Sequence, residues 1–205
     1  MTTTAPAESV GRGRPASTSR QELSRLALGL FARQGYEETT VDEIASAAGI
    51  SRRTFFRYFD AKPDAVWGEF DAELERLAAR LAEAPVDEPM LEVLRRSVMA
   101  TNRFGAGELD ELRIRMSLIG SVPDLVAHSA VRYEAWCDVV ARFAAARLGC
   151  DPGDLAAQTV ARAALGAAMA AFSSWARTGG DDLVDQVDRA FRLLADGFDG
   201  AGPGA

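Results

Sequence analysis

Apolar residues recur at helical spacing along almost the whole chain. Nowhere does a convincing alternation of apolar and polar residues predict a β-strand. The pattern therefore predicts an all-α protein. In the stretch 62–83, for example, large apolar side chains stand three or four positions apart and form one stripe, made of Val66, Phe70, Leu74, Leu77 and Leu81.

Glycines, prolines and capping residues divide this pattern into about nine helices. Ser19 with Glu22, and Thr40 with Glu43, form two capping boxes, in which the hydroxyl accepts from the amide three residues on and the glutamate reaches back. Ser51 supplies a third N-cap. The helices are expected near 19–35, 40–48, 51–59, 62–83, 90–104, 108–119, 123–148, 154–178 and 182–198.

Composition suggests four parts along the chain. Residues 1–18 are small and polar and are expected to form a disordered basic arm, and 200–205 a disordered tail. Residues 19–62 are expected to form a small domain and 63–199 a larger body. Pro85 and Pro89 also bracket a linker at which the N-terminal unit and the body are expected to separate.

The net charge of −7 conceals an asymmetry. Residues 1–60 hold eight arginines against seven acidic residues, a balance of +1, whereas 61–205 hold 15 basic against 23 acidic residues, a balance of −8. A near-neutral N-terminal part with clustered arginines is thus joined to an acidic body. This distribution favours a polyanion-binding N-terminal end.

Several classes of protein lack support in the sequence. A signal peptide and an uncharged apolar run of about 18 residues are absent, so we expect a cytoplasmic protein with no membrane partner. Cys137 and Cys150 are far apart and are expected to be free thiols. His128 is the only histidine, so no metal site is expected. No catalytic triad, P-loop or dinucleotide motif predicts an enzyme or a cofactor.

A helix-turn-helix spacing is present in the N-terminal part. With Val41 as its first position, Ala45 is the fifth and Gly49 the ninth, while Phe55 and Tyr58 are the fifteenth and eighteenth. The small fifth residue lets the two helices cross closely, and glycine tolerates the positive φ of the turn. The two aromatic side chains are expected to lock the helices together.

A helical projection divides the aromatic-rich stretch "GISRRTFFRYFDAK" into two faces. One face is expected to pack inward and consists of Phe55, Tyr58 and Phe59. The other suits the DNA major groove, where arginine can make two hydrogen bonds to guanine. A solvated face without a partner is the alternative. The outward residues are Arg53, Phe56 and Arg57, with the hydroxyls of Ser51 and Thr54 placed to bind phosphate in the first turn.

The stretch "TTVDEIASAAGISRRTFFRYFDAK" resembles the N-terminal signature of the TetR family of transcriptional regulators, over about residues 19–62. The resemblance implies an α-helical homodimer with a DNA-binding head and a ligand-binding, dimerising body, most often a repressor released by a small molecule. A palindromic double-stranded operator would be its DNA partner. The segments "RRTFFRYF", "WGEFDAELERL" and "HSAVRYEAWCDVVARFAAARLG" carry a narrower resemblance to the TetR-type regulators encoded with mycofactocin biosynthesis genes.

By position, the resemblance gives Thr40 a phosphate contact, Arg52 a place on the recognition helix, and Lys62 an approach to the DNA backbone. Phe56 departs from it, because the family often has tyrosine there and the hydroxyl is lost. Pro63 replaces a usual acidic residue, although proline is acceptable in a first turn. The predicted DNA-binding residues in the head are therefore Thr40, Ser51, Arg52, Arg53, Thr54, Phe56, Arg57 and Lys62.

The stretch Gly11-Arg-Gly-Arg-Pro15 is similar to the core of an AT-hook. Arg12 and Arg14 would follow the negative potential of a narrow minor groove. A disordered tail with two charges is the alternative interpretation. The position of these arginines just before a DNA-binding head favours the minor-groove contact.

The body is expected to hold a dimer interface and a ligand pocket. Residues 160–172 are rich in Ala and Gly and, with the final helix, predict a four-helix interface between two protomers; intramolecular packing is the alternative. The predicted ligand-binding residues are Met99, Phe104, Met116, Ile119, Trp136, Met169, Phe172 and Trp175. They favour a small hydrophobic effector, such as an acyl chain carried as its coenzyme A thioester. Arg113, Arg115 and Arg132 would meet an acidic head group or simply be solvated.

The sequence is thus compatible with two functional hypotheses. The first is a dimeric, ligand-responsive TetR-type repressor, with an activator or a ligand-insensitive repressor as variants within that class. The second is an all-helical small-molecule-binding protein or enzyme without a DNA role.

Overall fold

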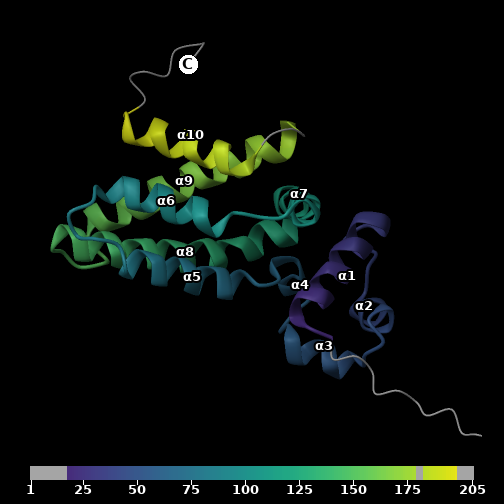
Figure 1. The fold of residues 1–205 in the computed structure, drawn as a ribbon. Coiled ribbons are helices and arrows are strands. Elements are labelled where there is room, and N and C mark those ends of the chain that lie inside the picture. The colour runs from purple at the N-terminus through teal and green to yellow at the C-terminus, as the bar shows by residue number, and fades with distance from the viewer. Residues whose placement is uncertain (1–17, 179–181, 198–205) are drawn as a thin grey trace, which may run out of the picture.

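A computed structural model describes residues 18–178 and 182–197, and within these ranges it contains ten α-helices and no strand. The predicted all-α class is confirmed. Figure 1 shows a small N-terminal group of helices, the head, beside a larger group, the body. The predicted tail at 200–205 and nearly all of the predicted arm lie outside the described residues.

The N-terminal caps form as the sequence predicts. Ser19 Oγ accepts from the Glu22 amide at 3.1 Å, and Thr40 Oγ1 accepts from the Glu43 amide at 3.2 Å. Ser51 Oγ accepts from the Thr54 amide at 3.1 Å. These caps start the three helices that lead into the recognition region, α1 (Arg20–Gln34), α2 (Val41–Ala47) and α3 (Arg52–Tyr58).

The head has its own core, against which all three predicted aromatic residues pack. Phe55 and Phe59 are buried, and their rings lie 5.4 Å apart. Tyr58 packs against this core, as predicted, although its side chain is only half-buried. Its hydroxyl needs a polar partner and donates to the Thr18 carbonyl oxygen at 2.5 Å.

The helix predicted over 62–83 is two helices, α4 (Asp64–Trp67) and α5 (Phe70–Ala82). This break accounts for ten helices where about nine were expected. It falls at Gly68, whose φ of +57° suits glycine and few other residues. A Cβ on Gly68 would also lie 2.9 Å from Ser24 Oγ and 3.3 Å from Arg115 Nη2. A short connecting helix therefore joins the head to the body.

The body consists of α5 and five further helices: α6 (Met90–Thr101), α7 (Ala106–Ser121), α8 (Pro123–Leu148), α9 (Leu155–Thr178) and α10 (Leu183–Ala195). Helix α9 packs against both α8 and α10. Within the described ranges, only α9 is long and apolar enough to cross a membrane by length and composition. One face of α9 contributes Ala161, Ala164, Ala168 and Trp175 to the core of the body.

The prolines at 85 and 89 do not mark a domain boundary. Leu77 and Leu81 of α5 share one core with Val93 and Leu94 of α6, so the expected separation at 84–89 is wrong. The segment is a turn inside the body. Arg147 of α8 holds it by donating to backbone carbonyl oxygens, among them that of Pro85 at 2.6 Å and those of Val86 and Glu88 at 2.9 Å each.

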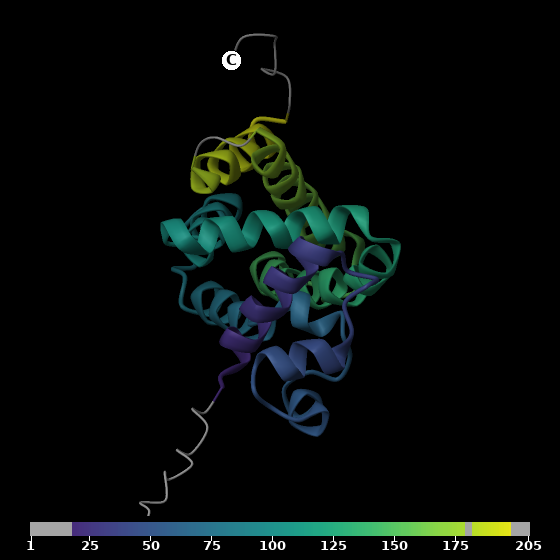
Figure 2. The ribbon, with the colours of Figure 1, turned by 90° about the vertical axis from the view of Figure 1, so that its right-hand side faces the viewer.

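The head and the body share apolar contacts as well as a connecting helix. Ile119 of α7 and Leu125 of α8 are buried in the core of the head, together with Val66 of α4. Figure 2 shows α7 lying across α1. Arg25 of α1 pairs there with Glu111 of α7. A displacement of α7 or α8 would therefore move residues that pack in the core of the head.

Candidate functional site

The outward face of α3 carries three of the predicted DNA-binding side chains. Arg53, Phe56 and Arg57 are all exposed, and Phe56, at 41%, is an unusually exposed large apolar residue. Its ring and the Phe55 ring form a T-shaped pair, with 5.4 Å between ring centroids. The helical projection of the sequence is thus reproduced, with arginines flanking one exposed ring.

The first turn of α3 is tied to α2 and to its own cap. Arg52 Nη1 lies 3.0 Å from Asp42 Oδ2, and its guanidinium lies over the Phe56 ring at 5.3 Å. The Ser51 and Thr54 hydroxyls lie 2.9 Å apart and are hydrogen-bonded. These contacts stabilise the turn between α2 and α3. The predicted phosphate-binding hydroxyls, those of Ser51 and Thr54, lie at the start of α3.

Thr40 and Lys62 fix the entry to α2. The Thr40 amide and hydroxyl both donate to the Glu43 carboxylate, which lowers the pKa of Glu43. Lys62 Nζ donates to the carbonyl oxygens of Tyr36 and Thr39, at 2.8 and 3.2 Å, and lies over the Tyr36 ring at 4.0 Å. Lys62 therefore holds the segment before α2, in addition to any contact that it makes with DNA.

Arg12 and Arg14, predicted from the sequence to follow the minor groove, lie outside the described residues. The described chain begins at Thr18, whose carbonyl oxygen accepts the hydrogen bond from Tyr58. The point at which the arm joins the head is therefore beside the last residue of α3.

An apolar cavity of about 670 Å³ lies in the body, a volume in the range of small-molecule sites. Six of the eight predicted ligand-binding residues line it: Phe104, Met116, Ile119, Trp136, Met169 and Phe172. Met99 and Trp175 do not contribute to the wall. Met99 packs on the body core, and Trp175 is fully buried beneath the guanidinium of Arg113, 4.1 Å from its ring centroid.

The three arginines considered for an acidic head group have different surroundings. Arg113 donates to the Trp175 carbonyl oxygen at 2.9 Å, and Arg132 pairs with two aspartates. Arg115 lines the cavity instead, where burial lowers its pKa. Glu73 lines the same region, and burial raises the pKa of its carboxyl. The cavity is thus mostly apolar, with a polar end.

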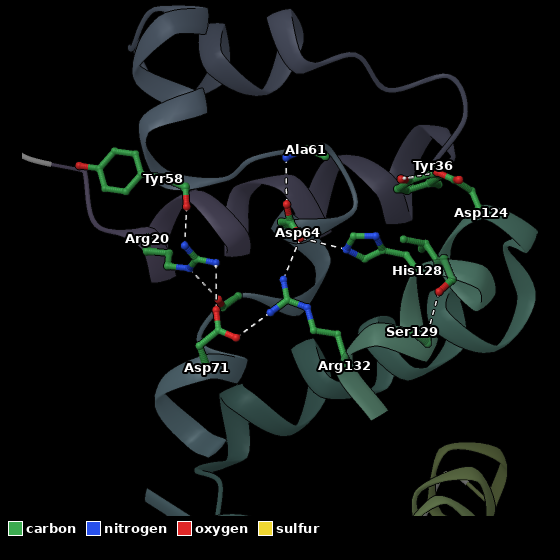
Figure 3. Close-up of polar contacts among 12 residues, drawn as sticks. Arg20, Tyr36, Tyr58, Ala61, Asp64, Asp71, Asp124, His128, Ser129 and Arg132 are labelled. Atoms are coloured by element: carbon green, nitrogen blue, oxygen red, sulfur yellow. Dashed lines mark hydrogen bonds and ion pairs between the residues drawn. The ribbon is translucent and has the colours of Figure 1, made fainter. Parts of the chain in front are cut away.

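A polar cluster joins the connecting helix α4 to α8 (Figure 3). Asp64 Oδ1 accepts from His128 Nε2 at 2.9 Å and from Arg132 Nη2 at 2.8 Å, while Asp64 Oδ2 accepts from the Ala61 amide at 2.9 Å. Arg132 Nη1 also lies 2.7 Å from Asp71 Oδ1 at the start of α5. Burial alone would raise the pKa of Asp64, but these hydrogen bonds hold it below its usual value.

The polar cluster and the cavity meet on the same two helices. Trp67, at the other end of α4 from Asp64, lines the cavity, and so does Ser129, the neighbour of His128 on α8. Sequence reasoning did not find Asp64, because an acidic residue after Lys62-Pro63 is also what an ordinary first helical turn carries. The partnership of His128 was equally hidden, since 64 positions separate it from Asp64.

Two family descriptions match the chain. Residues 24–64 match "Bacterial regulatory proteins, tetR family", and residues 88–199 match "MftR C-terminal domain". The mycofactocin biosynthesis transcriptional regulator MftR of Mycobacterium tuberculosis is 37% identical over 91% of this chain and 94% of its own length. The regulator TcmR of Streptomyces glaucescens is 36% identical over 70% of this chain and 66% of its own.

Among solved structures, Thermus thermophilus FadR is similar over 91% of this chain and 100% of its own, with 26% identity and a TM-score of 0.56. It is described as a TetR-family repressor in complex with lauroyl-CoA. The two family matches and these relatives agree with the geometry, in which a helix-turn-helix head is joined to a body that contains an apolar cavity.

Proposed function

The chain belongs to the TetR family of bacterial transcriptional regulators, whose members bind DNA and act as dimers, and on this premise we propose that it is a repressor released from its operator by a molecule with a long apolar chain, such as an acyl-CoA. One observation carries this proposal. The short helix α4 contacts the cavity through Trp67 and the body's polar cluster through Asp64, and it follows directly on the helix-turn-helix.

The DNA contacts that we propose come from the face of α3. Arg53 and Arg57 have no ion-pair partner in the described part of the chain, so both guanidinium groups are available to guanine in the major groove. The hydroxyls of Thr40, Ser51 and Thr54 would bind phosphates beside it. Lacking a hydroxyl, Phe56 would offer an apolar contact, such as to a thymine methyl group.

The dimer that we propose forms through α9 and α10. Only 28% of the most apolar window of α9 is buried in the described protomer. Its uncovered face includes Gly166 and Ala170, which are small and exposed. Small residues on such a face let a second helix approach closely, and a two-fold axis there would match a palindromic operator with half-sites about one helical turn apart.

The effector class follows from the cavity and from one relative. An apolar wall favours a hydrocarbon chain, and FadR, which resembles this chain in fold and sequence, is described with lauroyl-CoA. The likeness to MftR supports regulation of genes connected with mycofactocin. In the mechanism that we propose, the ligand displaces α4 through Trp67 and so alters the position of the head. This requires a different ligand affinity in the two states.

Fluorescence anisotropy on DNA from beside the gene tests the proposal. We expect specific binding of two chains to each palindromic site, competed poorly by unrelated DNA, and release on addition of dodecanoyl-CoA. Equal binding to operator and unrelated DNA would refute the role as a sequence-specific regulator. Operator binding that dodecanoyl-CoA leaves unchanged, despite its binding to the protein, would refute the release mechanism.

A further inference from the structure

Arg115 of α7 is a largely buried guanidinium for which the structure shows no hydrogen bond or ion pair. It lies in the wall of the apolar cavity and also in the wall of an adjoining polar cleft of about 370 Å³. Its Nε atom is fully enclosed and has no acceptor. Arg115 therefore stands where the apolar and the polar space meet.

Other arginines at partly buried positions of the body have acceptors. Arg132 bonds Asp64 and Asp71, Arg113 bonds the Trp175 carbonyl oxygen, and Arg95 pairs with Glu92. Buried charges in proteins are ordinarily paired in this way, because an isolated one is costly. The absence of an acceptor for Arg115 thus needs a specific explanation.

The neighbouring carboxylates do not supply that acceptor. Glu73 and Glu111 are close enough for their charges to act on Arg115. No ion pair within 4.0 Å joins Arg115 to either of these residues, and Glu111 instead pairs with Arg25 of the head. The charge of Arg76 also acts on Glu73 and opposes the increase in its pKa that burial causes, so Glu73 does not interact with Arg115 alone.

We propose that Arg115 binds an oxyanion of the effector, a carboxylate or a phosphate, while the apolar chain of the same molecule occupies the cavity. The planar fork of a guanidinium matches both oxyanions with two parallel hydrogen bonds. The proposal rests on the function proposed above, because it assigns the polar end of that ligand. It makes Arg115 a determinant of specificity, which selects charged amphiphiles over neutral ones of the same length.

The position of Arg115 also places the oxyanion at the break between α4 and α5. Arg115 Nη2 lies 3.3 Å from the point where a Cβ would stand on Gly68. Gly68 lines the polar cleft together with Arg115, so an oxyanion that Arg115 binds in this cleft would lie close to the break between α4 and α5.

Calorimetric titration of dodecanoate, dodecanoyl-CoA and dodecanol tests whether Arg115 binds the oxyanion of the ligand. We expect the wild-type protein to bind at least one of the two anionic probes about tenfold or more tightly than dodecanol, since hydrogen bonds between charged groups are of that strength. Arg115→Gln should lose this preference and keep its dodecanol affinity. Arg115→Lys should retain part of it, and Arg142→Gln, at an exposed arginine outside both spaces, should retain all of it.

Thermal melting without ligand distinguishes a ligand-binding role of Arg115 from a structural one. Because Arg115 has no acceptor in the protein, Arg115→Gln should melt at the wild-type temperature or above it, and a markedly lower melting temperature would count against the proposal. Loss of dodecanoate affinity would identify a carboxylate partner, and loss confined to dodecanoyl-CoA a phosphate. If the wild-type protein binds dodecanol as tightly as both anions, oxyanion binding by Arg115 is refuted and the proposed effector class is not. Wild-type protein that binds none of the three overturns the proposed effector class as well.

Discussion

The carboxylate of Asp64, on α4, lies 2.8 Å from the guanidinium of Arg132, on α8. The two side chains are only 9% and 15% exposed, so the attraction between them is weakly screened by solvent. The ion pair joins the short helix that follows the recognition region to the longest helix of the body. Because α4 also contacts the cavity through Trp67, the pair holds a helix that lies between the proposed ligand and the proposed DNA contacts.

Asp64→Asn should lower the free energy of unfolding by about 2 kcal/mol at neutral pH, because the change removes the charge that Arg132 and His128 face and leaves Arg132 with only its exposed partner Asp71. Urea unfolding followed by circular dichroism measures the loss. Asp138→Asn, at an exposed aspartate elsewhere on α8, is the control and should change little. Equal stability of the two variants would show that the pair contributes nothing.

The same variant should change how stability depends on pH. The pKa of Asp64 is held below its usual value in the folded protein, so its contribution is fully present above the unfolded pKa of about 3.9 and is lost as pH falls through the lower folded pKa. Wild-type protein should thus lose more stability than Asp64→Asn between about pH 5 and pH 3. Parallel curves for the two proteins over this window would argue against the lowered pKa.

Arg53→Ala and Arg57→Ala should each weaken operator binding by about 1–3 kcal/mol, as expected for an arginine that reads a base. Both side chains are exposed and without ion-pair partners in the described chain, so melting temperature and oligomeric state should stay unchanged. Arg142→Ala provides the matched control. If both variants bind the operator like the wild type, the face of α3 does not read DNA.

Gly68→Ala should destabilise the protein by more than about 1 kcal/mol. Alanine adopts a φ of +57° poorly, and its methyl group would meet Ser24 Oγ at 2.9 Å. Gly107→Ala is the comparison, since Gly107 lies within α7 with no atom near its Cβ position and should be neutral or slightly stabilising. Equal melting temperatures for the two variants would remove the argument that the α4–α5 break requires glycine.

Deleting residues 1–16 should weaken operator binding and reduce its dependence on salt concentration. The shortened protein would neutralise fewer phosphates, so its binding would release fewer counterions. Binding isotherms at several salt concentrations measure both effects. The control is the full-length Arg12→Lys, Arg14→Lys double variant, which keeps the charge but not the fork of each guanidinium. Unchanged affinity and salt dependence after the deletion would exclude the arm from the complex.

The helices of the head could be predicted closely because their signals are local. Ser19, Thr40 and Ser51 cap the helices that the sequence predicts, and the projection of α3 assigned its outward residues correctly. Tyr58 packs against the core as predicted but is only half-buried, because a projection separates the faces of a helix and does not show how far the core extends. The break at Gly68 was missed since a single glycine inside an apolar stripe is compatible with a continuous helix.

The candidate sites could be predicted less completely, because they depend on contacts between distant segments. Large apolar residues on the middle helices indicated a pocket, yet nothing in the sequence separates Trp175, which is buried core, from Trp136, which lines the cavity. Likewise, the three arginines considered for a head group are equivalent in sequence. Only their tertiary surroundings distinguish Arg115, which has no acceptor, from Arg113 and Arg132, which have them.

Operator affinity measured with and without saturating dodecanoyl-CoA tests the central claim most directly. The wild-type protein should bind its operator at least about tenfold more weakly in the presence of the ligand, a coupling free energy of about 1.4 kcal/mol or more. Asp64→Asn should show a smaller ratio, because the connection between α4 and α8 is weakened. A ligand that calorimetry shows to be bound, with operator affinity the same in its presence and absence, would contradict the account.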